Sequence, residues 1–380
     1  MGFTQGIWAS PAEHLRATQP GHPVIYAAPS ILQATARRFQ EGFPGLVTYA
    51  VKANPDPLVL TNFAAAGITA FDVASPYEME LVREAVPGAV LHYNNPVRAR
   101  DEIVRAVALD VASWSVDSES ELAKLEGVVP AGCEVSVRFK LPVTGGAYDF
   151  GTKFGATPEA AAQLLQRVAA LGYVPAMTFH PGTQCTAPDA WSAYIDAAAG
   201  IARRAGVTLA RLNVGGGFPA RRQLAEPEML EDIFAVISQA VRRAFGPDHP
   251  RLVCEPGRAM VAEGFSLAAQ VKAIRDGGDI FLNDGVYGAL SELPVMGNTD
   301  RLSVLSSDGR ARRGNPVARA VFGPTCDSID RLPGTLNLPG DVAEGDFILF
   351  QGLGAYSTAT VTRFNGYGAL EQAVVLDVSS

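Results

Sequence analysis

Eight short β-rich runs of this sequence end in residues that can do chemistry or hold a small ligand. The runs are LVTYAVK, AFDVAS, VLHYN, SWSVDS, EVSVRF, AMTFHPG, RLNVGGG and RLVCEPG. A random set of strand ends would contain fewer ionisable groups and glycines, so these residues are candidates for a single site. In chain order they are Lys52, Asp72, Asn94, Asp117, Arg138, His180, Gly215, Gly216, Gly217, Glu255 and Arg258.

Lys52 indicates which chemistry this set can support. A solvated lysine is the ordinary interpretation of an isolated one, but a lysine amine near a phosphate site can bind a phosphorylated aldehyde as an imine. Consecutive glycines and Arg258 can hold the phosphate, although the glycines alone also fit a tight turn. Glu255 can face the nitrogen of a pyridine ring, and His180 can lie on the ring face or be merely structural. Together these groups predict pyridoxal phosphate (PLP) as the cofactor.

The segments between the runs have the patterns of capped amphipathic helices. Ser75 with Glu78 and Ser118 with Glu121 match capping boxes, and the helix that begins at Thr157-Pro158 is expected to end before a glycine. Eight alternating strand and helix units in about 220 residues predict a (β/α)8 barrel, whose active site lies at the carboxyl ends of the strands. An open Rossmann sheet is the competing fold, but VGGGFPA lacks its GxGxxG spacing.

Composition excludes several classes of protein. The 380 residues are 48% hydrophobic and carry a net charge of −8, which argues against a nucleic-acid partner. The N-terminus lacks the basic start and the apolar run of a signal peptide. No segment of the sequence reaches the ~20 apolar residues of a membrane span. We therefore expect a cytoplasmic protein. The four cysteines are Cys133, Cys185, Cys254 and Cys326, and they form no CxxC pair. We therefore expect neither a structural metal site nor a disulfide framework. Each cysteine is either a core residue or a reactive thiol.

Short alternating strands outside the repeated units predict a second domain. They are PVIYA, RLSVLSS, ARAVFG, DFILFQGLGAY and LEQAVVLD. We expect a PLP-binding barrel domain at residues 24–264 and a β domain formed by residues 1–23 and 265–380. The β domain is expected to include the N-terminal strand, to resemble a sandwich or barrel, and to contribute to the active site and a dimer interface.

Several longer motifs resemble one enzyme family from about Pro23 to Gly368. They are YAVKAN, FDVAS, SVDSESEL, FHPGTQC, GGGFP, EPGR, NDGVYG, GPTCDSID and GAY followed by FNGYG. The sequence resembles the fold-type III PLP-dependent decarboxylases, which have an alanine racemase-like barrel and act on ornithine, lysine, arginine or diaminopimelate. NDGVYG, TCDSID and RFNGYG are more similar to the ornithine branch than to the diaminopimelate branch.

The resemblance implies a role for each matching residue. Lys52 matches the lysine that binds PLP covalently, His180 the histidine stacked on the ring, and Glu255 the partner of the ring nitrogen. Asp72 and Arg138 match residues that support the imine and the ring hydroxyl. The residues that match the phosphate binders are Thr183, Gly216, Gly217, Arg258 and Tyr356. Thr183 replaces the usual serine and keeps its hydroxyl.

Cys326 and Asp327 match a pair that reaches the substrate across a dimer interface. The resemblance places the cysteine near the substrate Cα and the aspartate near the distal amine, which implies a homodimer with composite active sites. The implied reaction removes the carboxylate from Cα of an amino acid. Cys326 or Lys52 then returns a proton to Cα.

The sequence departs from the ornithine branch where that branch has a Tyr-Asp pair. Val295 and Met296 occupy these positions, so Met296 is expected to contact the substrate without supplying a carboxylate. Either Asp327 holds the substrate ammonium, helped by Glu292 or Asp300, or the substrate tail is not a plain ammonium. The expected reaction is L-ornithine to putrescine, a step of polyamine biosynthesis, with L-lysine as the next substrate. Amino-acid racemisation is one alternative, and the acid expected at the ring nitrogen argues against it. A non-catalytic regulatory homologue is another, and the intact Lys52 and Cys326 argue against it.

Overall fold

The computed structural model describes residues 6–142 and 153–379. Within these residues the chain forms two compact units. The first, here called the barrel unit, comprises Thr35–Pro219 and Glu228–Met260. The second, the mixed-sheet unit, comprises Met1–Ala34, Ala220–Pro227 and Val261–Ser380. The domain boundaries predicted at residues 24 and 264 stay a prediction.

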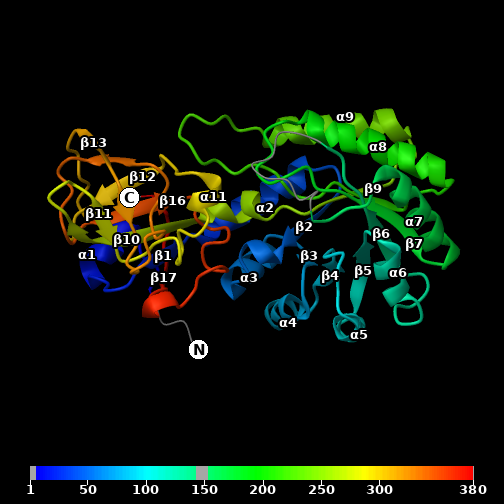
Figure 1. The fold of residues 1–380 in the computed structure, drawn as a ribbon, viewed down its shortest axis with the longest axis horizontal. Coiled ribbons are helices and arrows are strands. Elements are labelled where there is room, and N and C mark those ends of the chain that lie inside the picture. The colour runs from blue at the N-terminus through cyan, green and yellow to red at the C-terminus, as the bar shows by residue number, and fades with distance from the viewer. Residues whose placement is uncertain (1–5, 143–152, 380) are drawn as a thin grey trace. The chain divides into compact units, whose positions relative to one another are not determined.

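The barrel unit contains a closed barrel of parallel strands, as far as the described residues show (Figure 1). The strands pair in chain order, and the first also pairs with the last. The register places Ala50 beside Asp72 and Val73 beside Tyr93, so the carboxyl ends of neighbouring strands are level. Each predicted run overlaps one of these strands, which confirms the barrel: β2 (Leu46–Ala50), β3 (Ala70–Val73), β4 (Val90–Tyr93), β5 (Val111–Val116), β6 (Glu134–Arg138), β7 (Val174–Thr178), β8 (Arg211–Asn213) and β9 (Arg251–Cys254).

The predicted caps are present on the helices of the barrel unit. Ser75 Oγ accepts the amide N–H of Glu78 at 3.3 Å, and Ser118 Oγ accepts that of Glu121 at 3.3 Å. These bonds satisfy amides that the first helical turn leaves without partners. No helix of the described residues is long and apolar enough to cross a membrane. The helices between the strands are α3 (Pro57–Ala65), α4 (Pro76–Ala85), α5 (Arg100–Ala108), α6 (Glu119–Leu125), α7 (Pro158–Ala170), α8 (Asp189–Ala205) and α9 (Leu230–Phe245).

The mixed-sheet unit joins the two ends of the chain in one sheet. The strand order is β12-β16-β10-β1-β17, and β11 pairs with both β10 and β14. In Figure 1 the blue strand β1 lies among strands from the other end of the chain, as the predicted N-terminal strand requires. Two further strands, β13 (Pro316–Arg319) and β15 (Leu336–Pro339), form a hairpin-like pair. The sheet strands are β1 (Val24–Ala27), β10 (Phe265–Ile274), β11 (Ile280–Leu282), β12 (Leu302–Leu305), β14 (Val321–Phe322), β16 (Phe347–Gln351) and β17 (Glu371–Val374).

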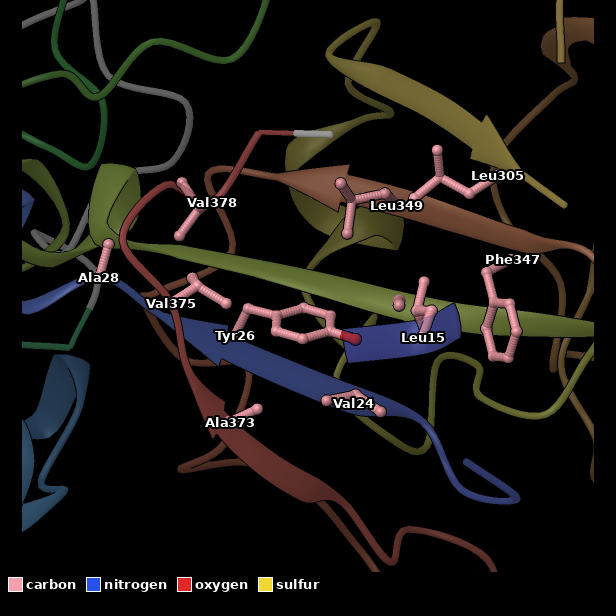
Figure 2. Close-up of a cluster of buried hydrophobic side chains, with 11 residues drawn as sticks. Leu15, Val24, Tyr26, Ala28, Leu305, Phe347, Leu349, Ala373, Val375 and Val378 are labelled. Atoms are coloured by element: carbon pink, nitrogen blue, oxygen red, sulfur yellow. The ribbon is translucent and has the colours of Figure 1, made fainter. Parts of the chain in front are cut away.

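An apolar cluster covers one face of this sheet. Figure 2 shows Val24 and Tyr26 of β1 and Leu349 and Phe347 of β16, two strands that are separated by β10, as parts of one cluster. Helix α1 (Pro11–Thr18) adds Leu15, and each of these side chains is fully buried. Alternate side chains of these strands are buried together, and removing their apolar surface from water stabilises the sheet that joins the two chain ends.

Candidate active site

Lys52 lies where the first barrel strand ends. After β2 the chain forms a short 3-10 helix, Val51–Ala53, and then turns into α3, whose N-cap is Asp56. Asn54 holds this turn, because its Oδ1 accepts the amide N–H of Asp56 at 3.1 Å and its carbonyl accepts the Tyr49 hydroxyl at 3.0 Å. The neighbours of Lys52 are buried, whereas its own side chain is exposed. The fold thus presents the amine at the carboxyl end of the barrel.

A cavity of about 200 Å³ lies at this end of the barrel unit. The structure therefore brings together most of the ionisable strand-end residues that the sequence singled out. Asp117 is not part of the lining, and its Oδ2 accepts the amide N–H of Gly155 at 2.9 Å. The predicted residues in the lining are Lys52, Asp72, Asn94, Arg138, His180 and Glu255.

Glu255, which follows β9, offers one carboxylate oxygen to the cavity. Its Oε1 accepts hydrogen bonds from the amide of Asn94, at 2.6 Å, and from the amide of Asn213. No hydrogen bond from the described residues reaches Oε2. Burial, with the nearby charge of Asp72, raises the pKa of Glu255 to about 8. Because burial disfavours the ionised form of Glu255, a cationic N–H placed at Oε2 would stabilise that form strongly.

Asp72 and Arg138 are side chains of opposite charge in the lining of the same cavity. Burial raises the pKa of Asp72, and the charge of Lys52 opposes this effect. Burial lowers the pKa of Arg138, and the carboxylates of Glu255, Asp117 and Asp72 oppose that effect. The guanidinium carbon of Arg138 lies 5.0 Å from the ring centre of Phe154. Lys52, Asp72 and Arg138 therefore provide charge of both signs around one small volume.

His180 is a neutral ring at physiological pH. Burial, together with the charges of Lys52 and Arg138, lowers its pKa well below the ordinary value. Its Nδ1 accepts the amide N–H of Gly182 at 3.1 Å, which places the ring proton on Nε2. A fixed neutral imidazole in the cavity wall suits stacking against an aromatic ring, and the stacking role of His180 stays a prediction.

The three glycines after β8 form a backbone cradle. Gly215 and Gly217 have φ of 71° and 83°, a region that favours glycine. A Cβ at Gly215 would overlap the carbonyl oxygen of Phe179, and one at Gly217 would overlap that of Gly182. Within the described residues, no acceptor takes the amide N–H of Gly216 or Gly217. Such backbone amides form an anion site, so a phosphate fits this cradle.

The other predicted phosphate binders lie in different parts of the chain. Arg258 begins the short helix α10 (Arg258–Val261) and is buried, and Thr183 lies half-buried in the loop after β7. Tyr356 belongs to the mixed-sheet unit and has φ of 60°, an unusual conformation for a residue with a side chain. Strained backbone of this kind concentrates at functional sites. The roles of these three residues stay predictions.

In the mixed-sheet unit, Asp330 ties together two of the family-like motifs. Its carboxylate accepts the amide N–H of Val286 at 2.9 Å and both the amide and hydroxyl of Thr325, at 2.9 and 2.7 Å. A Cβ at Gly285 or Gly323 would overlap this carboxylate. NDGVYG and GPTCDSID therefore interlock through one buried aspartate and two glycines that leave room for it.

This interlock presents Cys326 and Asp327 at the surface of the unit. The Cys326 side chain is exposed, and its amide N–H donates to Asn365 Oδ1 at 3.1 Å. The Tyr287 hydroxyl donates to Asp327 Oδ2 at 2.6 Å. This bond lowers the pKa of Asp327 and raises that of Tyr287 to about 12. Asp327 is thus held as a charged carboxylate beside an accessible thiol.

The residues that replace the usual Tyr-Asp pair lie on a short helix, α11 (Leu293–Met296). Val295 is 66% exposed and Met296 is half-buried. Asp300, one of the predicted helpers, accepts the amide N–H of Leu224 at 2.7 Å. Asp300 therefore already has a structural partner, and the substrate contact predicted for Met296 stays a prediction.

Asp284 of NDGVYG gives the mixed-sheet unit a predictable pH dependence. Burial, with the nearby charge of Asp330, raises the pKa of Asp284 from 3.8 to about 7. The folded state then holds a proton that the unfolded chain releases, so this group's contribution to stability falls from about pH 4 to pH 7 and is constant above. We expect Asp284→Asn to remove this loss, and to be more stable than the wild type at pH 8 by up to about 4 kcal/mol.

Thermal unfolding at pH 5 and pH 8 measures the effect. The exposed Asp276→Asn is a matched control and should follow the wild type at both pH values. If the difference in unfolding temperature between Asp284→Asn and the wild type is the same at pH 5 and pH 8, Asp284 is not protonated in the folded protein.

Sequence reasoning missed the hydrogen-bond partners of the catalytic candidates. Asn213 was not singled out, although it precedes the glycine cradle by two residues, and Asn94 was noted only as a strand end. Phe154 lines the cavity and Tyr287 holds Asp327, yet neither received a role. Its position at the carboxyl end of β8 is a usable signal for Asn213, because active-site residues of such barrels lie at strand ends.

A barrel with a lysine, a glycine cradle and a buried carboxylate at its strand ends defines a PLP-binding enzyme. The residues fit this group, because Glu255 Oε2 suits the ring nitrogen and the free amides suit the phosphate. Residues 30–262 match the family model described as "Pyridoxal-dependent decarboxylase, pyridoxal binding domain". The chain belongs to this family and is a PLP-dependent amino acid decarboxylase.

Known relatives narrow the substrate to basic amino acids. The chain is 31% identical over 342 residues to ornithine decarboxylase from Mus musculus, covering 84% of this chain and 73% of that protein. The arginine decarboxylase of Paramecium bursaria Chlorella virus has a TM-score of 0.86 at 25% identity, covering 95% of this chain and 98% of that one. A lysine/ornithine decarboxylase from Vibrio vulnificus, complexed with the diamine cadaverine, has a TM-score of 0.81 at 26% identity, covering 97% and 99%. The chain is therefore a basic amino acid decarboxylase.

Proposed function

We propose that this enzyme decarboxylates L-ornithine to putrescine, with L-lysine as its next substrate. The observation that carries the proposal is Asp327, an ionised carboxylate held by Tyr287 at 2.6 Å beside an accessible Cys326. A carboxylate without a cationic partner is costly to remove from water. The distal ammonium of a diamino acid supplies that partner.

The barrel residues have the roles that their positions support. Lys52 binds the cofactor covalently, Glu255 holds the ring nitrogen, His180 stacks on the ring, and Asp72 and Arg138 orient the ring hydroxyl side. The phosphate is held by Thr183, Gly216, Gly217, Arg258 and Tyr356. When bound, PLP stores the electron pair that the departing carboxylate leaves behind. The protein orients the substrate so that this carboxylate faces away from water.

Cys326 returns the proton to Cα in this proposal. Its exposure in the described chain supports a role in which a second copy of the chain is its partner. Each active site is then composite, with Cys326, Asp327 and Met296 contributed by the partner of the chain that supplies Lys52. The enzyme is accordingly a homodimer in which neither subunit is active alone.

Ornithine remains the first choice although Met296 cannot supply a second carboxylate. Oδ1 of Asp300 is engaged with the amide of Leu224, so Asp327 is the main partner of the ammonium and Glu292 is the remaining helper. A hydrogen bond to a charged group is worth roughly 1.5–3 kcal/mol. Losing one of two such bonds weakens binding without changing the kind of substrate that fits.

A substrate panel tests this proposal. We expect kcat/KM for CO2 release to decrease from L-ornithine to L-lysine, and to be lower again for L-arginine, meso-diaminopimelate and uncharged amino acids. Asp327→Asn should lower kcat/KM for ornithine about 10- to 100-fold. The exposed Asp341→Asn is the matched control, because Asp341 also accepts a backbone amide. An uncharged or acidic amino acid that exceeds ornithine and lysine would refute the role of Asp327 but not that of the PLP site.

A further inference from the structure

Asn94 contacts both buried carboxylates of the barrel cavity. It follows β4 and is 9% exposed. Its Nδ2 donates to Glu255 Oε1 at 2.6 Å. Burial raises the pKa of Asp72, and hydrogen bonding from the same Asn94 side chain opposes this effect. A primary amide nitrogen has two N–H groups, so it can donate to two acids. One neutral side chain therefore bridges two buried acids.

The bridge determines which oxygens face the cavity. Asn94 and Asn213 both occupy Oε1 of Glu255, which leaves Oε2 without a donor among the described residues. Oδ1 of Asp72 is buried and likewise has no hydrogen-bond partner within the described chain. Glu255 Oε2 and Asp72 Oδ1 are therefore the oxygens of the two acids that are available to a ligand.

The loop that carries Asn94 is itself held in place. The amide of Asn95 donates to the carbonyl of Ala74 at 3.2 Å, and Arg98 Nε donates to the carbonyl of Asn95 at 2.9 Å. The Arg98 guanidinium is buried against the ring of Tyr93, 4.9 Å from its centre. Asn94 therefore has a fixed position before any cofactor binds.

We propose that Asn94 is a positioning residue for the PLP ring nitrogen: it turns Glu255 Oε2 toward that nitrogen and prevents Glu255 and Asp72 from sharing a proton. Two neighbouring carboxylates without a donor between them tend to hold one proton jointly. A proton retained on the acid pair is not available to the ring nitrogen, which weakens the ring as an electron store. The proposal rests on the pairing of Glu255 with the ring nitrogen given under Proposed function.

The protonation of the ring nitrogen can be measured directly. Enzyme reconstituted with ¹⁵N-pyridine-labelled PLP reports it as an NMR chemical shift, without any turnover. We expect a protonated nitrogen in the wild type and a shift toward the unprotonated value in Asn94→Ala. The kcat for ornithine should fall about 10- to 100-fold, which corresponds to one hydrogen bond to a charged group, with KM changed less.

Three further measurements keep the outcome decisive. Asn94→Ser retains one shorter donor and should give a smaller shift than Asn94→Ala. Asn95→Ala loosens the same loop without touching an acid, so it should leave the ¹⁵N shift unchanged. An equal shift in Asn95→Ala, or a protonated nitrogen with wild-type kcat in Asn94→Ala, overturns the role of Asn94. An unprotonated nitrogen in the wild-type enzyme instead overturns the Glu255 pairing itself, together with the role of Asn94.

Discussion

Lys52→Ala should lose all covalently bound PLP and all measurable decarboxylation. Among the strand-end residues in the cavity lining, only Lys52 has an amine that can form an imine with an aldehyde, since the other ionisable ones are an arginine, a histidine and two acids. The glycine cradle remains in the variant, so it should still bind PLP reversibly through the phosphate. Borohydride reduction followed by mass spectrometry measures the covalent fraction, and absorbance measures the reversible one.

Lys52→Arg is the matched variant, because it keeps the positive charge but not the reactive amine. We expect it to behave like Lys52→Ala in the reduction experiment. Borohydride-stable PLP on another lysine of the barrel, for example Lys153 in the cavity lining, would show that the assignment to Lys52 is wrong.

Glu255→Ala should retain PLP but lower kcat by about two to four orders of magnitude. Removing one partner of a buried ion pair costs roughly 3–5 kcal/mol, and this cost appears in the rate when the pair is strongest in the transition state. The variant also leaves the amides of Asn94 and Asn213 without their acceptor. Steady-state kinetics with ornithine and PLP content of the purified protein separate the loss of rate from loss of cofactor.

Glu255→Gln distinguishes charge from hydrogen bonding. Its amide oxygen can still accept from Asn94 and Asn213, but the side chain carries no charge. We expect its kcat to be closer to that of Glu255→Ala than to that of the wild type. A near-wild-type rate in either variant would contradict the pairing of Glu255 with the ring nitrogen.

The barrel could be predicted from the sequence because its signals are local. Each predicted run contains β-branched or aromatic residues and has polar residues or glycines at or near its end, and caps such as Ser75 mark the helices. Lys52, Asp72, Arg138, His180 and Glu255 followed from the rule that active sites lie at strand ends, and the cavity brings them together.

The parts that could not be predicted depend on long-range contacts. Strand β10 was missed, since FSLAAQVKAI contains residues that are as common in helices, and its pairing with β1 and β16 decides its conformation. Strands β11 and β15 were also missed, because each is too short to show a pattern. The bridging role of Asn94 depends on the rotation of its amide between two acids from other strands, which no spacing in the sequence encodes.

The sheet that joins the chain ends affects how the protein is made on the ribosome. Strand β1 is synthesised first, but it pairs with β10 and with β17, near the end of the chain. At ordinary translation rates it waits roughly 10–50 s for β10. The barrel strands pair with sequence neighbours and can fold during this time, apart from the closure of β2 against β9. The apolar segment VIYA is therefore an exposed, unpaired strand throughout barrel synthesis, which makes it the natural binding site for a chaperone during translation.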